Sequence, residues 1–424
     1  MLRRVGFNLI DLIRGTSSIA LLRELESIQF ESGMAIRQRQ KQLLDDYFDA
    51  LRAALPLYAE YRSFEELPII DKAFANRNRE QLTNSHYRGR RIRKKTGGST
   101  GEPLVFYTGT QSQSYLWAGI LLSWRAAGYR LGEPVAFLAG SSLFGTGFKE
   151  SVYYKLMNIK LFSAFELSEG RLQAYAKEIA SGGFRLIYGY AGAIYRLAQH
   201  VIASPTRPRF ALRGVVCTAE VLTPMMRRVT EAAFDAPCFN QYGCHDAGVS
   251  AYECERRQGL HLITTRCHQE VLEGGKLVST DLSNHVFFLP RYDTGDMVVM
   301  EDKPCPCGRG FPLIGEVTGR SNDLVSDPEG NTVHFMFFNY LFREDSRISS
   351  FQVLYDRHKL VINLHCETGN DWSGYLKRTA SSLKFDQVAF VENHSFVLSA
   401  SGKHRFVVRV DDVDAVLAGT ERMH

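Results

Sequence analysis

The run Lys95-Thr-Gly-Gly-Ser-Thr-Gly-Glu-Pro103 places three glycines and three hydroxyl side chains directly before an apolar, strand-like segment. Glycine tolerates positive φ and lets the backbone approach an anion, while exposed N–H groups and Ser/Thr hydroxyls donate hydrogen bonds to phosphate oxygens. The Gly-Lys-Ser/Thr ending of a Walker A loop is absent. Taken alone, the run is compatible with an ordinary flexible turn or with a polyphosphate-binding loop, and motifs further along the chain decide between the two.

Four later motifs occur in a defined order. They are Gln241-Tyr-Gly-Cys-His-Asp246, Arg291-Tyr-Asp-Thr-Gly-Asp296, Gly319-Arg-Ser-Asn-Asp323 and Ser401-Gly-Lys403. With the glycine-rich run, this ordered set resembles the adenylate-forming ligase superfamily. The segment Leu67-Pro-Ile-Ile-Asp-Lys72 and the motif Cys305-Pro-Cys-Gly-Arg309 narrow the resemblance to the phenylacetate–CoA ligase branch, especially its capsule-biosynthesis-like members. The resemblance covers the chain from about Gln40 to Lys403.

Length and composition predict an enzyme of more than one domain. The chain has 424 residues, of which 45% are hydrophobic, enough for a large core and two or three domains. No apolar run reaches the roughly 20 residues of a membrane span, and no signal peptide is recognisable, so a cytoplasmic protein is expected. Residues 1–14 alternate apolar and basic side chains. This pattern favours a helix packed on the main domain over a helix lying on a membrane surface.

A net charge of +5 over this length is mild and predicts no general affinity for nucleic acid. One dense basic run consists of Arg88, Arg90, Arg91, Arg93, Lys94 and Lys95. It lacks the interleaved aromatic residues of a nucleic-acid surface, and a solvated strand or loop is favoured. Because it directly precedes the glycine-rich run, a positive field that attracts ATP or an anionic acceptor is a further interpretation.

Hydrophobic periodicity divides the chain into three parts. Residues 17–65 show helical spacing, which predicts an N-terminal helical segment within 1–65. Short β-rich runs then alternate with helical stretches through 66–319, which predicts a large α/β domain with helix-covered sheets. After Gly319 the pattern changes, so residues 320–424 are expected to form a small, mobile α+β domain.

The cysteines suggest a metal centre. Eight cysteines without a secretory signal indicate reduced thiols rather than disulfides. Cys254, His261, Cys305 and Cys307 supply three thiolates and one imidazole, the ligand set of a closed tetrahedral structural zinc site. Cys-x-Cys alone is a weak signal, and Cys267-His268 compete as ligands, but the same pair of segments recurs in the resembled family. Small core positions are predicted for Cys217, Cys238 and Cys366.

The resemblance also implies roles for residues near the nucleotide. The implied residues are Gly97, Gly98, Ser99, Thr100 and Gly101 for the β- and γ-phosphates, Tyr242 and Gly243 along the adenine, Asp246 for Mg²⁺, Asp296 for both ribose hydroxyls, Arg320 for the ribose or phosphate, and Glu220 close to the nucleotide. Asp246 departs from the glutamate usual in the family, and Asn322 stands where an aspartate is usual. His245 is either a contact of the acyl carboxylate or a structural histidine.

Lys403 is the implied catalytic cation. In a mobile C-terminal domain it would bridge the attacking carboxylate and the α-phosphate, and rotation about Asn322 and Asp323 would then remove it. The expected activity is ATP-dependent formation of an acyl- or aryl-adenylate with Mg²⁺, followed by transfer to CoA or to an amine or sugar acceptor. An adenylyltransferase acting on a phenolic cofactor and a catalytically silent nucleotide-binding protein are the alternatives. Self-association as a homodimer is left open.

Overall fold

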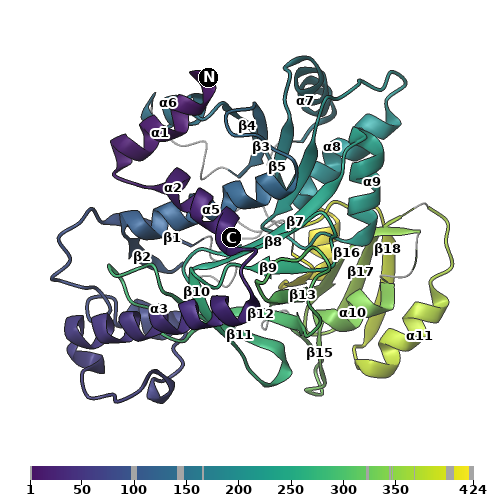
Figure 1. Cartoon of the computed structure of the whole chain (residues 1–424). Helices are drawn as coiled ribbons and strands as arrows, with labels where there is room; N and C mark the ends of the chain where they lie inside the picture. The colour runs from purple at the N-terminus through teal and green to yellow at the C-terminus, as the bar shows by residue number, and fades with distance from the viewer. Residues whose placement is uncertain are drawn as a thin grey trace.

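The computed structural model describes residues 2–96, 103–140, 148–164, 167–320, 324–342, 345, 347–366, 368–397 and 405–419. Its described elements are built around an eleven-stranded mixed sheet and a separate four-stranded sheet, each with helices against it (Figure 1). The large sheet has the strand order β10-β11-β12-β13-β9-β8-β7-β6-β5-β3-β4. The predicted α/β class, with a helix-covered sheet and a smaller α+β part toward the C-terminus, is confirmed.

One half of the large sheet is parallel. Its strands are β3 (Val135–Ala139), β4 (Ile159–Ser163), β5 (Leu186–Tyr190), β6 (Gly214–Thr218) and β7 (Cys238–Cys244). The helices that alternate with them are α5 (Thr110–Ala126), α6 (Phe148–Leu156), α7 (Glu169–Ser181), α8 (Ala191–Ala203) and α9 (Pro224–Phe234). Crossover helices of this kind cover a parallel sheet and bury its strands, as the fully buried Leu186, Ile187 and Val216 show.

The other half is antiparallel. It contains β8 (Val249–Glu253), β9 (Leu260–Leu262), β10 (Cys267–Val271), β11 (Lys276–Asp281), β12 (Tyr292–Glu301) and β13 (Leu313–Arg320). A 3₁₀ turn, η4 (Glu273–Gly275), joins β10 to β11. Strands β4 and β10 form the two edges. Ligands of open α/β sheets bind beyond the carboxyl ends of parallel strands, which draws attention to the end of β7.

The N-terminal helices pack on this sheet. They are α1 (Leu2–Arg14), α2 (Ser18–Ile28), α3 (Gly33–Ala54) and α4 (Lys72–Arg77), with 3₁₀ turns η1 (Pro56–Tyr58) and η2 (Phe64–Glu66). Helix α2 lies along α5, and Leu25 on α2 and Leu51 on α3 are fully buried. Burial of each such side chain contributes about 1.5–3 kcal/mol. Helix α1 buries Phe7 and Ile10, so the prediction of a packed first helix is confirmed.

A hairpin of β1 (Ile92–Lys95) and β2 (Val105–Thr108) brackets the glycine-rich run. At the end of the hairpin next to the run, the Thr96 amide donates to the Leu104 carbonyl at 2.9 Å, and the Leu104 amide donates to Thr96 Oγ1 at 2.9 Å. The run is therefore presented between two hydrogen-bonded strands.

The C-terminal elements form their own sheet and core. The sheet has the order β18-β17-β16-β19, from β16 (Ile348–Tyr355), β17 (Lys359–Cys366), β18 (Gln387–Glu392) and β19 (Val407–Arg409). The other elements are a hairpin of β14 (Leu324–Ser326) and β15 (Thr332–His334), α10 (Phe335–Phe342), α11 (Ser373–Ser382) and α12 (Val413–Leu417). No helix in the described part of the chain has both the length and the apolar character needed to cross a membrane.

Candidate nucleotide site and metal centre

Three motif side chains meet at the end of β7. The Tyr242 hydroxyl donates to Asp296 Oδ2 at 2.7 Å, and Arg320 Nε lies 3.3 Å from Asp296 Oδ1. Asp296 and Arg320 are register partners on β12 and β13, whereas three strands separate β12 from β7 in the sheet order. The sheet must therefore curl strongly for Tyr242 to reach Asp296.

The turn before Asp296 fixes this arrangement. Gly295 has φ +71°, a conformation that favours glycine, and a Cβ there would lie 3.0 Å from Arg320 Nη2. The Asp296 amide donates to Thr294 Oγ1 at 3.1 Å, and Arg320 Nη2 donates to the Thr294 carbonyl at 2.9 Å. The Thr-Gly-Asp sequence thus aims the carboxylate of Asp296 and seats the guanidinium of Arg320 against it. Burial and the Asp296 carboxylate hold the pKa of Tyr242 well above its usual range, so the hydroxyl stays a donor.

Asp246 lies in the same region. Its Oδ1 accepts from Cys244 Sγ at 2.9 Å, and burial together with Asp246 raises the pKa of Cys244 and of Tyr292. Among the described residues, Asp246 contacts the Cys244 thiol and the Tyr292 hydroxyl, which are both neutral donors. A carboxylate in such surroundings can take a divalent cation through oxygen.

His245 points into the interior. Its Nε2 is buried and has no hydrogen-bond partner among the described residues, and its ring lies 5.6 Å from that of Phe106. Burial, with Arg266 and Lys94 nearby, holds the pKa of His245 well below its usual range. The imidazole is therefore neutral. Lys94 faces inward on β1, where burial and Arg14 lower its pKa.

Glu220 has a local role that the motif does not reveal. Its Oε2 accepts from the Gly192 amide at 2.7 Å, at the first turn of α8. A carboxylate stabilises a helix N-terminus by about 0.3–1 kcal/mol. Glu220 therefore orients α8, and its carboxylate also raises the pKa of Tyr190 after burial has done so.

The four predicted metal ligands come together. The ligand atoms of Cys254, His261, Cys305 and Cys307 all lie within 4.8 Å of one another. Two of these separations are 3.6 Å, between Cys254 Sγ and Cys305 Sγ, and 3.4 Å, between Cys307 Sγ and His261 Nε2. Ligand bonds of about 2.3 Å to sulfur and about 2.0–2.1 Å to nitrogen in a tetrahedron give separations of about 3.8 Å and 3.6 Å. The four residues fit a tetrahedral zinc ion.

Backbone turns present these thiols. The Arg256 amide donates to Cys254 Sγ and the Arg309 amide to Cys307 Sγ, each at 3.4 Å. Without a metal, burial raises the pKa of Cys254 to about 12 and lowers that of His261 to about 4. For Cys307, burial is outweighed by the Arg309 amide and nearby side-chain donors, which lower its pKa.

The competing ligands lie elsewhere. Cys267 is buried with its thiol 3.9 Å from the Ile263 carbonyl, and the His268 ring packs edge-on against Phe64 at 5.4 Å. Cys217 and Cys238 are fully buried, as predicted, and their sulfurs are 3.7 Å apart. Cys366 lies at the end of β17, where it is partly buried and packs against the core of the C-terminal sheet.

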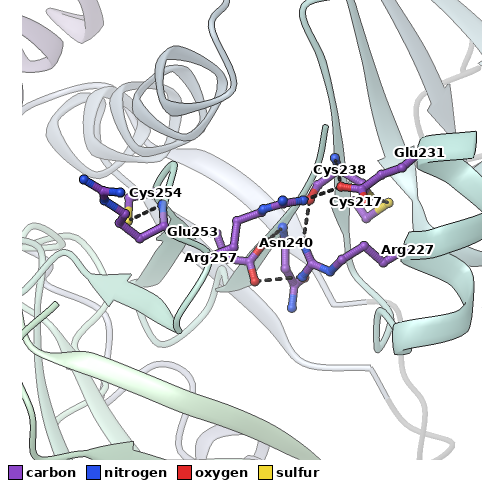
Figure 2. A network of polar contacts seen from close by, with 9 residues as sticks. Cys217, Arg227, Glu231, Cys238, Asn240, Glu253, Cys254 and Arg257 are labelled. Atoms are coloured by element: carbon purple, nitrogen blue, oxygen red, sulfur yellow. Dashed lines mark hydrogen bonds and ion pairs between the residues drawn. The ribbon is translucent and has the colours of Figure 1, made fainter. Parts of the chain in front are cut away.

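A polar network connects the segment of the candidate metal ligand Cys254 to α9 (Figure 2). Arg227 on α9 donates two hydrogen bonds to the carboxylate of Glu253, the residue before Cys254. Its Nη1 lies 3.0 Å from Oε2 and its Nη2 lies 2.8 Å from Oε1. The Asn240 amide donates to the same carboxylate at 2.7 Å, and Glu231 accepts from the Cys238 amide at 2.9 Å. The side chains of Glu253 and Arg227 are largely buried, so the pair fixes α9 against β7 and β8.

Several predicted positions lie outside the described residues. These are Gly97, Gly98, Ser99, Thr100 and Gly101 of the glycine-rich run, Ser321, Asn322 and Asp323 of the third motif, and Lys403. Gly243 is described and is exposed on β7 beside Tyr242. Two side chains near the site were not singled out in the sequence. Tyr292 belongs to the motif Arg291–Asp296 but had no predicted role of its own. Arg266, directly before Cys267 in the chain, carries no local sequence signal.

The chain is similar to known proteins in sequence and in fold. No family model matches the sequence. The chain is 23% identical over 370 residues to protein CapK of Staphylococcus aureus, a match that covers 82% of each chain. It is 31% identical over 129 residues to phenylacetate-coenzyme A ligase of Thermus thermophilus, covering 27% of this chain and 29% of that protein. Among solved structures, 2-hydroxyisobutyryl-CoA ligase in the postadenylation state with R3-HIB-AMP superposes with a TM-score of 0.68 at 16% identity, covering 91% of this chain and 90% of that one.

Proposed function

We propose that this chain, which belongs to the adenylate-forming superfamily on the branch of CapK and phenylacetate–CoA ligase, is an ATP-dependent carboxylate-activating ligase. In the first step a carboxylate oxygen attacks the α-phosphate of ATP, the bond to the β-phosphate oxygen breaks, and pyrophosphate leaves. In the second step an acceptor nucleophile displaces AMP from the acyl-adenylate. Catalysis of both steps depends on positioning and charge stabilisation.

The observation that carries this proposal is the contact of Tyr242, Asp296 and Arg320 at the end of β7. An ionised carboxylate has about four acceptor sites, so Asp296 can keep Tyr242 and still accept from two ribose hydroxyls. Arg320 beside it supplies a fixed positive charge for the phosphate side of the nucleotide. Tyr242 offers its ring as a flat surface for adenine. Glu220 would contribute indirectly, because its hydrogen bond from the Gly192 amide positions α8.

The phosphates and the metal occupy the neighbouring part of the site. Asp246 would hold Mg²⁺, which neutralises charge on the phosphates when bound. Gly97, Gly98, Ser99, Thr100 and Gly101 would bind the β- and γ-phosphates from the hairpin that opens beside Thr96. We assign Lys403 to the first step, where its ammonium would lie between the attacking carboxylate and the α-phosphate. His245, held neutral, would face the acyl group.

The same proposal divides the chain. We place the N-terminal helical segment at 1–65, the ATP- and acyl-binding domain at 66–319, and a small lid domain at 320–424 that rotates between the two steps. We also propose one structural zinc ion bound by Cys254, His261, Cys305 and Cys307, since four ligands leave no open position for chemistry.

CoA is the leading acceptor. The relatives named phenylacetate-coenzyme A ligase and 2-hydroxyisobutyryl-CoA ligase support a thiol acceptor. An amine or sugar acceptor would use the same first step and differ only in the second. The acid must therefore be identified before the acceptor.

Carboxylate-dependent exchange of labelled pyrophosphate into ATP tests the proposal. Wild-type protein should show exchange only with an added acid from a panel, and Asp296→Asn should reduce it. Glu301→Gln, in the same strand and exposed, is the matched charge control. Exchange that requires a phenol instead of a carboxylic acid would indicate an adenylyltransferase, and ATP binding without exchange for any compound would indicate a silent nucleotide-binding protein.

A further inference from the structure

Arg266 is a buried cation with an unsatisfied edge. It lies between β9 and β10, is 1% exposed, and donates through Nη1 to Ser250 Oγ. Its Nε and Nη2 have no hydrogen-bond partner among the described residues. A buried charged donor without a partner is costly, so such groups are normally paired with a protein group, an ordered water or a ligand.

The unsatisfied edge has the shape of a carboxylate receptor. Elsewhere in this chain the same two nitrogens bind carboxylates side-on. Arg213 holds Glu133 through Nε and Nη2 at 3.1 and 3.0 Å, and Arg291 holds Glu270 at 3.0 and 2.7 Å. Two parallel N–H groups match the two oxygens of a carboxylate. Arg266 presents this edge inside the large domain.

The surroundings of Arg266 are polar. The hydroxyl of Thr264 is buried and has no partner among the described residues. Asp281, which lies opposite Cys267 on β11, already accepts from the Ser112 hydroxyl and the Ser283 amide, each at 2.9 Å. On the side of α5, Gly119 allows the close approach of Ser250, the group that fixes the guanidinium.

This polar cluster adjoins the proposed active site. Ser250, which accepts from Arg266, is the register partner of Gly243 on β7, two residues before His245, and the buried Nε2 of His245 also has no partner within the described part of the chain. His245 is followed directly by Asp246, next to the nucleotide motifs. Strands β7 and β8 therefore connect the segment around Asp246 to the unsatisfied edge of Arg266.

We propose that Arg266 binds a second anionic group of the acid substrate, so that the chain activates one carboxylate of a compact dicarboxylic acid while Arg266 holds the other. This inference rests on the proposed function. The reacting carboxylate is a poor partner for Arg266, because two charge-assisted hydrogen bonds would hold it in the buried site and lower the nucleophilicity of the oxygen that must attack the α-phosphate. The distal carboxylate has no such requirement.

Wild-type protein provides the first test. Matched pairs of acids with one and two carboxylates, such as butanoate and butanedioate, pentanoate and pentanedioate, and benzoate and benzene-1,3-dicarboxylate, are scored by kcat/KM for pyrophosphate release. At least one diacid should exceed its monoacid by 10-fold or more. A consistent preference for monoacids would overturn the inference and leave the ligase function standing.

Failure of every acid to release pyrophosphate would count against the ligase function. The assignment of Arg266 would then be decided by calorimetric binding of the same acids without ATP. Tighter binding of a diacid than of its monoacid supports it, and equal or absent binding overturns it.

Variants give the second test. Arg266→Met removes the donors at similar length and should lower kcat/KM for the best diacid by about 10- to 100-fold, the effect expected for a lost hydrogen bond between charged groups. It should leave the matched monoacid within about threefold. Arg213→Met is the control, since the same edge of that arginine is already filled by Glu133. Equal losses for diacid and monoacid in a folded Arg266→Met protein would refute the assignment. If this variant does not fold, Arg266→Lys, which keeps the charge without the paired edge, is measured in the same way.

Discussion

Replacement of Asp296 is the most direct probe of the nucleotide site. Asn keeps the size of the side chain and one carbonyl oxygen but substitutes a donor for the second acceptor and removes the charge. In the structure Oδ2 accepts from the Tyr242 hydroxyl at 2.7 Å and Oδ1 lies 3.3 Å from Arg320 Nε. Both oxygens therefore have a protein partner and retain acceptor capacity toward a ribose.

The expected loss follows from these contacts. Two ribose hydroxyls that donate to an ionised acceptor should together contribute about 2–4 kcal/mol, after allowance for the oxygen that Asn retains. At 1.4 kcal/mol per tenfold, Asp296→Asn should lower kcat/KM for ATP by about 30- to 700-fold.

A double-mutant cycle separates binding of the nucleotide from support of Tyr242. Tyr242→Phe removes the hydroxyl that donates to Asp296 and keeps the ring. The four proteins are compared by kcat/KM for ATP in pyrophosphate exchange and by thermal unfolding without nucleotide. If Asp296 contacts ribose, its replacement should still cost at least tenfold in the Tyr242→Phe background. No further loss in that background would show that Asp296 serves only to hold Tyr242, and normal ATP affinity in Asp296→Asn would refute the ribose assignment.

Three further predictions concern other parts of the molecule. Protein purified without a histidine tag should contain about one zinc ion per chain by elemental analysis, and Cys305→Ser should lose the metal and lower the midpoint of thermal unfolding; metal-free, fully stable wild-type protein would contradict the site. Lys403→Ala should lower acyl-adenylate formation by about 10²–10³-fold and leave transfer from a supplied acyl-adenylate nearly unchanged, whereas equal damage to both steps would argue against a lysine that acts only in the first. Hydrogen bonds from Arg347 lower the pKa of Asp345 to about 2. The ionised carboxylate therefore stabilises the folded C-terminal sheet at pH values above its unfolded pKa of about 4. This contribution to stability is lost as the pH falls toward 2. Since Arg347 is half exposed, the loss of stability measured by urea unfolding should be small, and Asp345→Asn should flatten the decline.

Local signals were sufficient for much of the secondary structure. Helix α9 begins at Pro224 and ends at Phe234 because Thr223 accepts a hydrogen bond from the Met226 amide, Pro224 fits the first turn, and Asp235 ends the helix in the left-handed conformation. The clustering of Cys254, His261, Cys305 and Cys307 could also be predicted from the sequence, since thiols and an imidazole at these spacings have few other combined uses.

Long-range geometry could not be read in the same way. Tyr242 and Asp296 are 54 positions apart, and their contact depends on how far the sheet curls across three intervening strands. The edge of Arg266 was equally hidden, because a sequence names donors but does not say which of them fail to find an acceptor. Glu220 shows a third case, in which a motif position also has a structural partner, the Gly192 amide.

The two edges of the large sheet bear on how the chain avoids self-association during folding. An eleven-stranded sheet has only two rows of unpaired peptide groups that could recruit another chain. On β10, Gln40 of α3 donates its side-chain amide to the Cys267 carbonyl at 2.9 Å and so imitates a further strand at that point. On β4, the exposed Lys160 places a charge that a docking strand would have to desolvate. Helix α3 therefore satisfies one outward-facing carbonyl of the β10 edge in addition to burying Leu51 in the core.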